Sequence, residues 1–430
     1  MEHQCHQSAD NKIIEIKYGK YHLSTKLPHH CEIHELKYNK LPLKKSDIID
    51  KLFSPSPEMP SLLELIDKSK KILFLIPDIT RKSGVKHFLY EIIEDIKKKE
   101  TDYKIIFATG THRTITEDEM KEILGFTLYD NIKEYIVFHS PDDLDNHIYY
   151  GKTKYGTPVL VNKVFNECDL IISIASISYH YFAGFGGGRK MIIPGIAATK
   201  TALNNHKLAI DEKNLTRNPE AKTGNIKGNP VHDDIVEGVM IASNNKELFA
   251  INTIVNKVEN IIDIEVGDLF LSHLRACSKY KEMTSMNVTK KYDILIVSCG
   301  GFPKDINMIQ AHKSLNRIQN IVKEGGTIFF FAECIDGYGN KFFEDFFDCK
   351  TSEEMMKKLI QNYHINRQTA YSLKVLTEKY NVYLYSALDK SETERMGFKK
   401  LETLKTFEHC NFKNKSIAYI PSAYNLYFTQ

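Results

Sequence analysis

Short, nearly continuous apolar runs alternate along this chain with segments of helical periodicity. In the first part of the chain the apolar runs are residues 71–76, 103–108 and 168–174. Helical periodicity lies between and after them, at residues 85–98, 117–124, 199–208 and 231–242. Strands that alternate with helices favour a parallel sheet that is covered by helices. The pattern therefore predicts an α/β fold.

A second series of the same kind begins after residue 290. It comprises strands at 291–298, 327–332 and 382–385 and a helix at 305–323. Because 430 residues exceed the size at which one hydrophobic core usually stops growing, we expect two domains. We place them at residues 1–280 and 281–430, as two α/β domains with mostly parallel, helix-covered sheets and an active-site cleft between them. The segment 415–421 could be a strand of either domain.

The N-terminal part differs from both series. Residues 13–27 alternate apolar and polar side chains around Tyr18-Gly19-Lys20, which predicts a hairpin. Residues 1–12 lack a basic region followed by an apolar run, so we expect no secretory signal and a cytoplasmic protein.

Composition argues against two classes of protein. The hydrophobic share is 42% and the charged share 26%, and no apolar stretch reaches the roughly 20 residues that span a bilayer. A net charge of +3, with basic and acidic residues interspersed, gives little attraction for nucleic acid. We therefore expect neither a membrane protein nor a nucleic-acid-binding protein.

The cysteines give little evidence of a metal site. The eight cysteines lie far apart, and no pair has the C-x-x-C spacing of zinc or redox sites, so we expect reduced thiols. One cluster has metal-binding residue types, namely His29, His30, Cys31 and His34. Nothing near it supplies a second pair of ligands at a structural-zinc spacing, so we do not expect a metal there.

Polar side chains follow several of the predicted strands, close to where these strands end. The residues placed in this way are Asp78, Arg81, His112, His180, Gln310 and Lys313. Each of them alone fits a helix cap or a hydrogen-bonded loop residue. In open α/β sheets, however, ligands bind at the carboxyl ends of the strands. Their coincidence at this edge therefore predicts a functional site.

A glycine-rich segment follows the third apolar run. It reads Gly184-Phe185-Gly186-Gly187-Gly188-Arg189-Lys190, which matches neither a P-loop nor a dinucleotide-binding fingerprint. Consecutive glycines let the backbone approach a ligand closely, and their N–H groups can bind a phosphate. A flexible loop or tight turn is the structural alternative, but it does not predict the flanking Arg189-Lys190 pair.

Lys190 and His206 are the two candidates for holding a cofactor. The apolar stretch Met191-Ile192-Ile193-Pro194 after Lys190 would desolvate the amine and lower its pKa, which makes it available as a nucleophile or attachment point. His206 lies on a segment of helical character, where a neutral imidazole could bind a metal. A solvated surface lysine and an ordinary hydrogen-bonded histidine are the alternatives.

Taken together, these segments resemble the lactate racemase family over essentially the whole chain. The resemblance is carried by Pro77-Asp78-Ile79-Thr80-Arg81, Ala108-Thr109-Gly110-Thr111-His112-Arg113, Ser178-Tyr179-His180-Tyr181-Phe182-Ala183 with the glycine-rich segment, Pro194-Gly195, and Gly300-Gly301-Phe302-Pro303-Lys304-Asp305. The long middle segment is highly specific, whereas the first two segments alone are not.

The resemblance implies an isomerase, a nickel-dependent racemase or epimerase of a small 2-hydroxy acid. Its cofactor would be a nickel-pincer nucleotide, pyridinium-3-thioamide-5-thiocarboxylate mononucleotide with nickel, which takes part in proton-coupled hydride transfer. Lys190 would hold this cofactor covalently as a thioamide, and His206 would complete a square-planar nickel centre. His112 and His180 match the acid/base histidines on opposite faces of the substrate carbon.

Further roles follow from the same resemblance. Gln310, Lys313 and Arg81 would bind the substrate. Asp78, Gly186, Gly187, Gly188 and Arg189 would surround the cofactor. The partners would be the hydroxy acid and the cofactor-synthesis proteins. The chain has Lys82 where relatives often have proline, and it has no Trp, which bears on substrate choice. Lactate, malate, longer aliphatic hydroxy acids and sugar acids stay open, as does the oligomeric state.

Two hypotheses that assign the chain to other classes of protein compete with the racemase hypothesis. A zinc-dependent hydrolase would use His112, His180 and His206 as three ligands, but it would not explain the glycine-rich segment or Lys190. A two-lobed phosphate- or nucleotide-binding protein without enzymatic activity would use the glycines and arginines, but it needs neither of the first two histidines.

Overall fold

The structure is a computed structural model that describes residues 11–36, 40–54, 56, 58–256 and 258–429. The chain forms two compact units. The larger unit holds Tyr38–Asp211 and Thr216–Met283. The smaller unit holds the chain before Tyr38, Glu212–Leu215 and the chain from Thr284 on. Among the described residues, no helix is long and apolar enough to cross a membrane.

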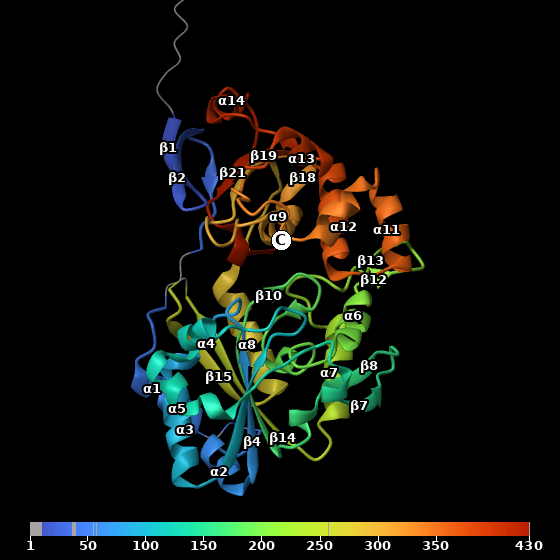
Figure 1. The fold of residues 1–430 in the computed structure, drawn as a ribbon. Helices are drawn as coiled ribbons and strands as arrows, with labels where there is room; N and C mark the ends of the chain where they lie inside the picture. Colours follow the sequence, from blue (N-terminus) through green and yellow to red (C-terminus); the bar gives the residue numbers. More distant parts are fainter. Residues whose placement is uncertain (1–10, 37–39, 55, 57, 257, 430) are drawn as a thin grey trace, which may run out of the picture. The chain divides into compact units, whose positions relative to one another are not determined.

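A six-stranded sheet forms the centre of the larger unit (Figure 1), with the strand order β15-β14-β9-β4-β5-β6. Its strands are β4 (Lys71–Pro77), β5 (Asp102–Ala108), β6 (Ile136–Val137), β9 (Leu170–Ser176), β14 (Glu247–Val255) and β15 (Ile261–Asp268). Neighbouring strands run parallel, except that β15 is antiparallel to β14. The predicted parallel sheet is therefore confirmed.

The apolar runs are continuous because this sheet is buried on both faces. Along β4, Ile72, Phe74 and Ile76 join one hydrophobic cluster, and Leu73 and Leu75 join the other. Residues of α1 to α5 line the first cluster and residues of α7 line the second, on opposite sides of the sheet in Figure 1. The helices are α1 (Lys45–Phe53), α2 (Leu62–Lys68), α3 (Leu89–Lys98), α4 (Glu117–Leu124), α5 (Phe126–Ile132), α6 (Thr199–Lys207), α7 (Pro230–Ala242) and α8 (Leu271–Thr284).

Local signals fix the ends of α4, whose predicted bounds are confirmed. The Thr116 side chain accepts a hydrogen bond from the Glu119 backbone N–H, and the Glu119 carboxylate accepts one from the Thr116 N–H, which forms a capping box. Gly125 follows the last turn with a φ of +84°, a conformation that favours glycine and ends the helix.

A second six-stranded sheet, all parallel, lies in the smaller unit, with the order β20-β19-β18-β17-β21-β3. Its strands are β3 (Glu32–Ile33), β17 (Tyr292–Ser298), β18 (Val322–Phe331), β19 (Asn381–Tyr385), β20 (Lys399–Lys400) and β21 (Ile417–Ile420). The helices of this unit are α9 (Met308–Ile318), α10 (Lys341–Glu344), α11 (Ser352–Gln361), α12 (Ile365–Lys379), α13 (Lys390–Arg395) and α14 (Leu404–Glu408). With both sheets, the predicted α/β class is confirmed.

Short strand pairs complete the two units. They are β7 (His147–Lys152) with β8 (Pro158–Asn162), β10 (Tyr179–His180) with β11 (Gly184–Phe185), β12 (Ile210–Asp211) with β13 (Thr216–Arg217), and β16 (Ser285–Asn287) with β22 (Tyr427–Thr429).

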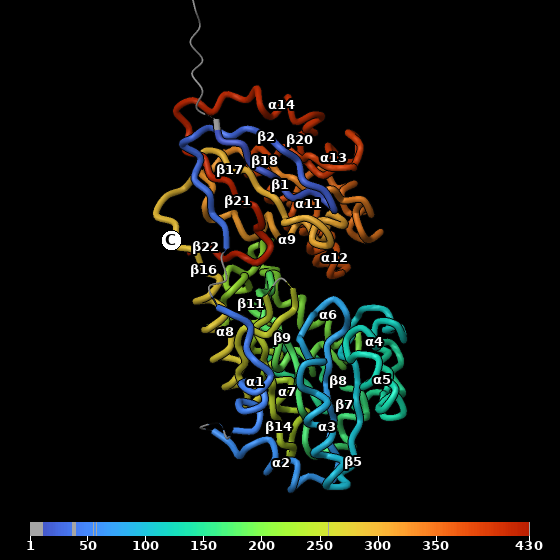
Figure 2. Tube along the Cα trace, turned by 90° about the vertical axis from the view of Figure 1, so that its left-hand side faces the viewer, coloured from blue at the N-terminus to red at the C-terminus, as the bar shows by residue number. Residues whose placement is uncertain are grey.

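The N-terminal hairpin lies in a different unit from the one that the predicted domain bounds assign to it. Strands β1 (Asn11–Tyr18) and β2 (Tyr21–Pro28) pair as the alternation predicts. Ile14, Ile16 and Leu27 are buried in a cluster with β17, β18 and β21, and Figure 2 shows the hairpin along these strands. The hairpin therefore belongs to the smaller unit and not to a domain 1–280, because its packing partners on β17, β18 and β21 all follow Met283 in the chain. The segment 415–421 lies in the same unit.

Candidate active site

Three loops of the larger unit follow three adjacent strands. Strands β9, β4 and β5 are neighbours and run parallel, so they end at the same edge of the sheet. The loops after them carry His180, Asp78 and His112, respectively. The fold therefore brings these three predicted residues to one edge of one sheet.

Asp78 and His112 form an ion pair or a charge-assisted hydrogen bond. Asp78 Oδ2 lies 2.6 Å from His112 Nδ1, and Asp78 Oδ1 accepts hydrogen bonds from the Thr80 N–H (3.0 Å) and hydroxyl (2.6 Å). Burial raises the pKa of Asp78, but the hydrogen bonds from His112 and Thr80 outweigh it, so the net shift is downward. An ionised Asp78 holds the proton of neutral His112 on Nδ1 and leaves Nε2 as a proton acceptor.

The loop that carries His112 is joined to the segment behind Lys190. The Gly110 N–H donates a hydrogen bond of 2.8 Å to the Gly195 carbonyl. Gly110 has a φ of +57°, and a Cβ there would lie 3.6 Å from the Pro194 carbonyl oxygen. This backbone contact links the acid/base loop to the candidate cofactor anchor.

The glycines of the long segment are explained first by backbone conformation and packing. Gly187 and Gly188 have φ values of +81° and +50°. A Cβ on Gly187 would lie 2.7 Å from the Ile177 side chain, and one on Gly188 would lie 2.9 Å from the His273 ring. The Gly186 N–H donates to the Ser178 carbonyl (2.8 Å). A cofactor contact by residues 186–188 stays a prediction.

Arg189 is fully buried, and its guanidinium bonds to groups of the protein. Its Nη1 lies 2.7 Å from His273 Nε2 and its Nη2 lies 2.8 Å from His232 Nδ1. Its other acceptors are the carbonyls of Ala183, Phe185 and Gly187. Burial, and then the charge of Arg189, lowers the pKa of His232 to about 3, so this imidazole is neutral and accepts. We call Arg189, His232 and His273 the arginine cluster; a contact of Arg189 with a cofactor stays a prediction.

Lys190 presents a buried amine. Its Nζ has no hydrogen-bond partner among the described residues. Burial, followed by the charges of Arg189 and Arg81, lowers the pKa of Lys190 well below its ordinary value. The amine therefore loses its proton more readily than an ordinary lysine, which is the direction that the apolar stretch after it predicts.

His206 lies on α6 and is also buried without a partner. Within the described part of the chain, both of its ring nitrogens lack a hydrogen-bond partner. Burial, and then the neighbouring Lys190, lowers the pKa of His206 well below its ordinary value. A neutral imidazole with an unused ring nitrogen is suited to bind a metal ion.

Phe182 lies between these residues and His180. Its ring centroid is 4.4 Å from that of His180, 4.6 Å from that of His206 and 5.9 Å from Lys190 Nζ. His180 Nδ1 accepts a hydrogen bond from the Ala183 N–H (3.2 Å), so the proton of neutral His180 is on Nε2. The two predicted acid/base histidines thus have opposite tautomers.

The two remaining predicted residues lie together in the smaller unit. Gln310 and Lys313 are on α9, where Lys313 Nζ donates to Gln310 Oε1 (2.7 Å) and lies 3.4 Å from the Tyr424 hydroxyl. Asn307 caps this helix through its side chain, which accepts from the Gln310 N–H. The pair is preformed as a donor-rich group suited to a carboxylate.

Neither competing metal arrangement is present in the described residues. No group of three or more His, Cys, Asp or Glu side chains there could hold a metal ion. His112, His180 and His206 are therefore not a three-histidine zinc site. In the N-terminal cluster, His34 Nε2 lies 2.8 Å from the Tyr292 hydroxyl and the Cys31 thiol donates to the Glu32 carbonyl.

Comparisons with known proteins decide the family. Residues 18–217 match the lactate racemase N-terminal domain and residues 287–423 match the lactate racemase C-terminal domain. The chain is 32% identical over 354 residues to a protein named lactate racemase from Thermoanaerobacterium thermosaccharolyticum, which covers 81% of this chain and 80% of that protein. The chain belongs to the lactate racemase family.

Further similarities agree with this family. A lactate racemase from Lactiplantibacillus plantarum is 35% identical over 258 residues, 60% of this chain and 58% of that protein. The lactate racemase apoprotein structure from T. thermosaccharolyticum has a TM-score of 0.86 at 29% identity and covers 97% of this chain and 100% of its own. A crystal structure of a Thermotoga maritima protein, with a TM-score of 0.66 at 17% identity over 91% of this chain and 100% of its own, shares the fold.

The sequence did not point to several residues that shape this site. Thr80, Phe182, His232, His273 and Tyr424 contact the predicted residues, yet none was singled out. Thr80 and Phe182 lie inside segments that carry the family resemblance, which is a usable signal. His232 and His273 lie on helices far along the chain, where they read as ordinary helix residues.

Proposed function

We propose that this protein interconverts the two stereoisomers of a small 2-hydroxy acid such as lactate. In this proposal a nickel-pincer nucleotide is tethered to Lys190, with His206 as a nickel ligand. Two relatives that match well carry the name lactate racemase, which supports the substrate class. The observation that carries the proposal is that the buried Lys190 amine and the buried His206 ring beside it both lack a hydrogen-bond partner in the part of the chain that the structure describes.

The Lys190 amine fits the role of a covalent anchor. A buried amine without a hydrogen bond is costly to leave in place, whereas an amide-like linkage is neutral and removes the cost of the charged form. Because the pKa of Lys190 is lowered, its amine gives up its proton more readily than an ordinary lysine, and the lone pair is then available to form that bond. Lys190 lies on the short helix η5 (Gly188–Met191) next to Arg189, whose guanidinium ties this helix to His232 and His273.

His206 fits the role of a metal ligand. An imidazole suits nickel in a planar site, and a buried ring that binds no other group can donate a nitrogen lone pair to it. His206 stays neutral at neutral pH because its pKa is lowered, so no proton competes with the metal.

When bound, the pincer nucleotide supplies a reversible acceptor for the hydrogen that leaves the substrate carbon together with its bonding electrons. The side chains of this chain handle the proton. His112 in its neutral form can take the proton of the substrate hydroxyl on Nε2, and His180 can return a proton to that oxygen from its imidazolium form. Each turnover therefore starts with one neutral and one protonated histidine, and the two exchange these states when the centre is inverted.

Other residues would bind and orient the acid. Gln310 and Lys313 offer an amide and an ammonium group to the substrate carboxylate. Arg81 lies on the loop after β4, where it is exposed beside Asp78. Its positive charge contributes to the lowered pKa of Lys190, so the same charge can attract an anionic substrate close to the anchor. Asp78 orients His112 and stabilises its protonated form.

The proposal is tested on protein produced with and without the cofactor-synthesis proteins. Loaded protein should carry about one nickel per chain and an added mass that maps to Lys190, and it should racemise at least one acid in a panel of enantiopure 2-hydroxy acids read by chiral chromatography. Lys190→Ala should abolish all three results, whereas Lys200→Ala, at an exposed lysine on α6, should abolish none. Loaded protein that carries nickel but inverts no acid of the panel would refute the proposed reaction.

A further inference from the structure

One phenyl ring lies against three of the residues assigned to the cofactor and the substrate. Phe182 is 1% exposed, and its ring is nearly perpendicular to the rings of His180 (80°) and His206 (73°). Lys190 Nζ lies 5.9 Å from the centroid of the same ring. Edge-to-face contacts at such distances are favourable and directional, so they resist rotation of the imidazoles.

The three rings also have a defined mutual arrangement. The centroids of His180 and His206 are 6.4 Å apart, and their planes are within 17° of parallel. With the 4.4 and 4.6 Å distances to Phe182, the centroids form a nearly right-angled triangle whose corner is Phe182. The phenyl ring is thus the common neighbour of a proton donor and a metal ligand that lie on different elements.

The phenyl ring is itself held on two sides. The Asn229 side chain donates hydrogen bonds to the carbonyls of Phe182 (2.8 Å) and Asn225 (2.9 Å), while it caps α7. The ring packs in a hydrophobic cluster with Ile192 and Ile193, the residues that follow the Lys190 segment. A side chain fixed by both its backbone and its packing can in turn fix its neighbours.

We propose that Phe182 is a positioning residue of this site: its ring sets the orientation of His180 and His206 and keeps the Lys190 amine beside them. The inference rests on the proposed function, because it concerns the anchor, the nickel ligand and a proton donor of that function. Phe182 does not act on the substrate in this role. It acts through the three side chains that it contacts.

The same segment offers a matched control. Phe185 lies three positions away, is 2% exposed, and its ring is tilted by 35° against that of Tyr179, with centroids 5.1 Å apart. Phe185→Leu makes the same substitution as Phe182→Leu at another buried phenylalanine close by in the chain. Both variants should therefore lose similar amounts of stability in chemical denaturation.

The first test uses loaded protein and follows nickel and turnover together. Phe182→Leu should lose nickel to a chelator about 10-fold faster than wild type and have a kcat about 10- to 100-fold lower, with KM changed by no more than about threefold. The added mass at Lys190 should remain. Phe185→Leu should keep the nickel loss rate and kcat within about threefold of wild type.

The second test uses unloaded protein, so it does not depend on the reaction. In histidine-labelled protein, the ring-proton resonances of His180 and His206, assigned with His180→Gln and His206→Gln, should move in Phe182→Leu and stay in place in Phe185→Leu. Equal effects of the two leucine variants on nickel loss and on these resonances would overturn the proposal. A wild type that holds nickel but inverts no acid would refute the proposed function, while this comparison would still decide the role of Phe182.

Discussion

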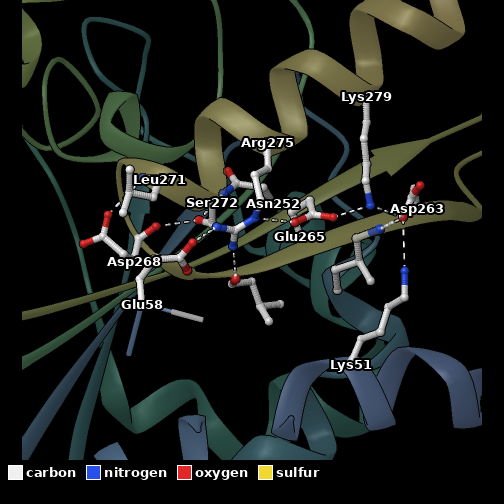
Figure 3. A network of polar contacts seen from close by, with 12 residues as sticks. Lys51, Glu58, Asn252, Asp263, Glu265, Asp268, Leu271, Ser272, Arg275 and Lys279 are labelled. Atoms are coloured by element: carbon white, nitrogen blue, oxygen red, sulfur yellow. Dashed lines mark hydrogen bonds and ion pairs between the residues drawn. The ribbon is translucent and has the colours of Figure 1, made fainter. Parts of the chain in front are cut away.

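Two groups of buried charge in the larger unit are built in opposite ways. Asp263, whose side chain is 6% exposed, lies within 2.6, 3.2 and 3.8 Å of the amines of Lys40, Lys51 and Lys279. Figure 3 shows that this network continues through Glu265 and Arg275 to Glu58. Arg189, which is fully buried, bonds to neutral imidazoles and carbonyls, and no carboxylate contacts it among the described residues.

The two groups differ in how their buried charges are compensated, and this difference bears on stability and on the proposed function. A buried charge costs several kcal/mol of desolvation unless opposite charges or hydrogen bonds repay it. In the Asp263 network, opposite charges do so, and the network joins α1 to β15 and α8. Around Arg189 only neutral groups do so, and the next residue, Lys190, is left with no partner for its amine among the described residues. In the proposed function, the arrangement that is poor for stability is the one that holds the cofactor.

The largest effect, a complete loss of activity, is expected where this contrast is sharpest, at the Lys190 amine. Lys190→Met should abolish racemisation and the nickel content of loaded protein. In unloaded protein it should raise the free energy of unfolding by about 1–2 kcal/mol, because a thioether satisfies the apolar site without a buried polar atom. Lys51→Met, which removes a partner of Asp263, should lower it by about 0.5–1 kcal/mol. Urea unfolding of the two variants gives the sign of each change in the free energy of unfolding. Changes of the same sign in both variants would contradict the comparison between the two groups of buried charge.

The next largest effect is expected on the guanidinium itself. Arg189→Met should lower the free energy of unfolding by about 3–5 kcal/mol, because it removes the guanidinium that bonds to two buried imidazoles and to the Phe185 carbonyl. Arg189→Lys should recover only part of this loss, since an ammonium group cannot reach acceptors on both sides. Chemical denaturation measures both variants. A loss below about 1 kcal/mol in Arg189→Met would show that the arginine cluster does not organise the segment.

A smaller effect is expected in the compensated network. Burial raises the pKa of Asp263, but the hydrogen bond from Lys40 and the charges of Lys51 and Lys279 outweigh it, so the folded-state pKa is lowered. Its contribution to stability is therefore present above the unfolded pKa of about 3.9 and is lost as the pH falls through the folded pKa. Asp263→Asn should cost about 1–2 kcal/mol at pH 7 and almost nothing at the acid end, where both proteins still fold. A cost independent of pH would contradict this account.

The smallest expected effect is a slope with pH. The pKa of Lys190 is lower in the folded state than in the unfolded state, so the unfolded chain binds more protons between the two values and stability rises with pH there. The difference in unfolding free energy between wild type and Lys190→Met should therefore shrink from pH 7 to pH 9 in unloaded protein. A difference that stays constant over this range would mean that the amine is charged or solvated in the folded state.

The placement of the candidate site residues could largely be predicted from the sequence, because the ends of strands and the loops after them are local features. The apolar run before Asp78, the run before His112 and the glycine-rich segment before Lys190 place these residues at one sheet edge. The apolar stretch after Lys190 indicates a desolvated amine. The Thr116 and Glu119 pair fixes the start of α4.

The rest depends on contacts between residues that are far apart in the chain. Nothing in the sequence near Arg189 tells that its two imidazole partners come from α7 and α8, 43 and 84 residues later. In the sequence, Phe182 is one apolar residue among several, and only the folded structure shows that its ring contacts His180 and His206. Local sequence also does not reveal that Ile177 and His273 fill the space beside Gly187 and Gly188, so the packing reason for these two glycines could not be predicted from it.

The N-terminal hairpin has a consequence for how the polypeptide is made. Every residue of the larger unit has been synthesised once Met283 is added, so this unit can fold while the ribosome is still working. The hairpin precedes the larger unit in the chain, yet it packs against β17, β18 and β21, which all follow Met283. An isolated hairpin is marginal in water, so this hairpin gains a permanent place only after those later strands have been made.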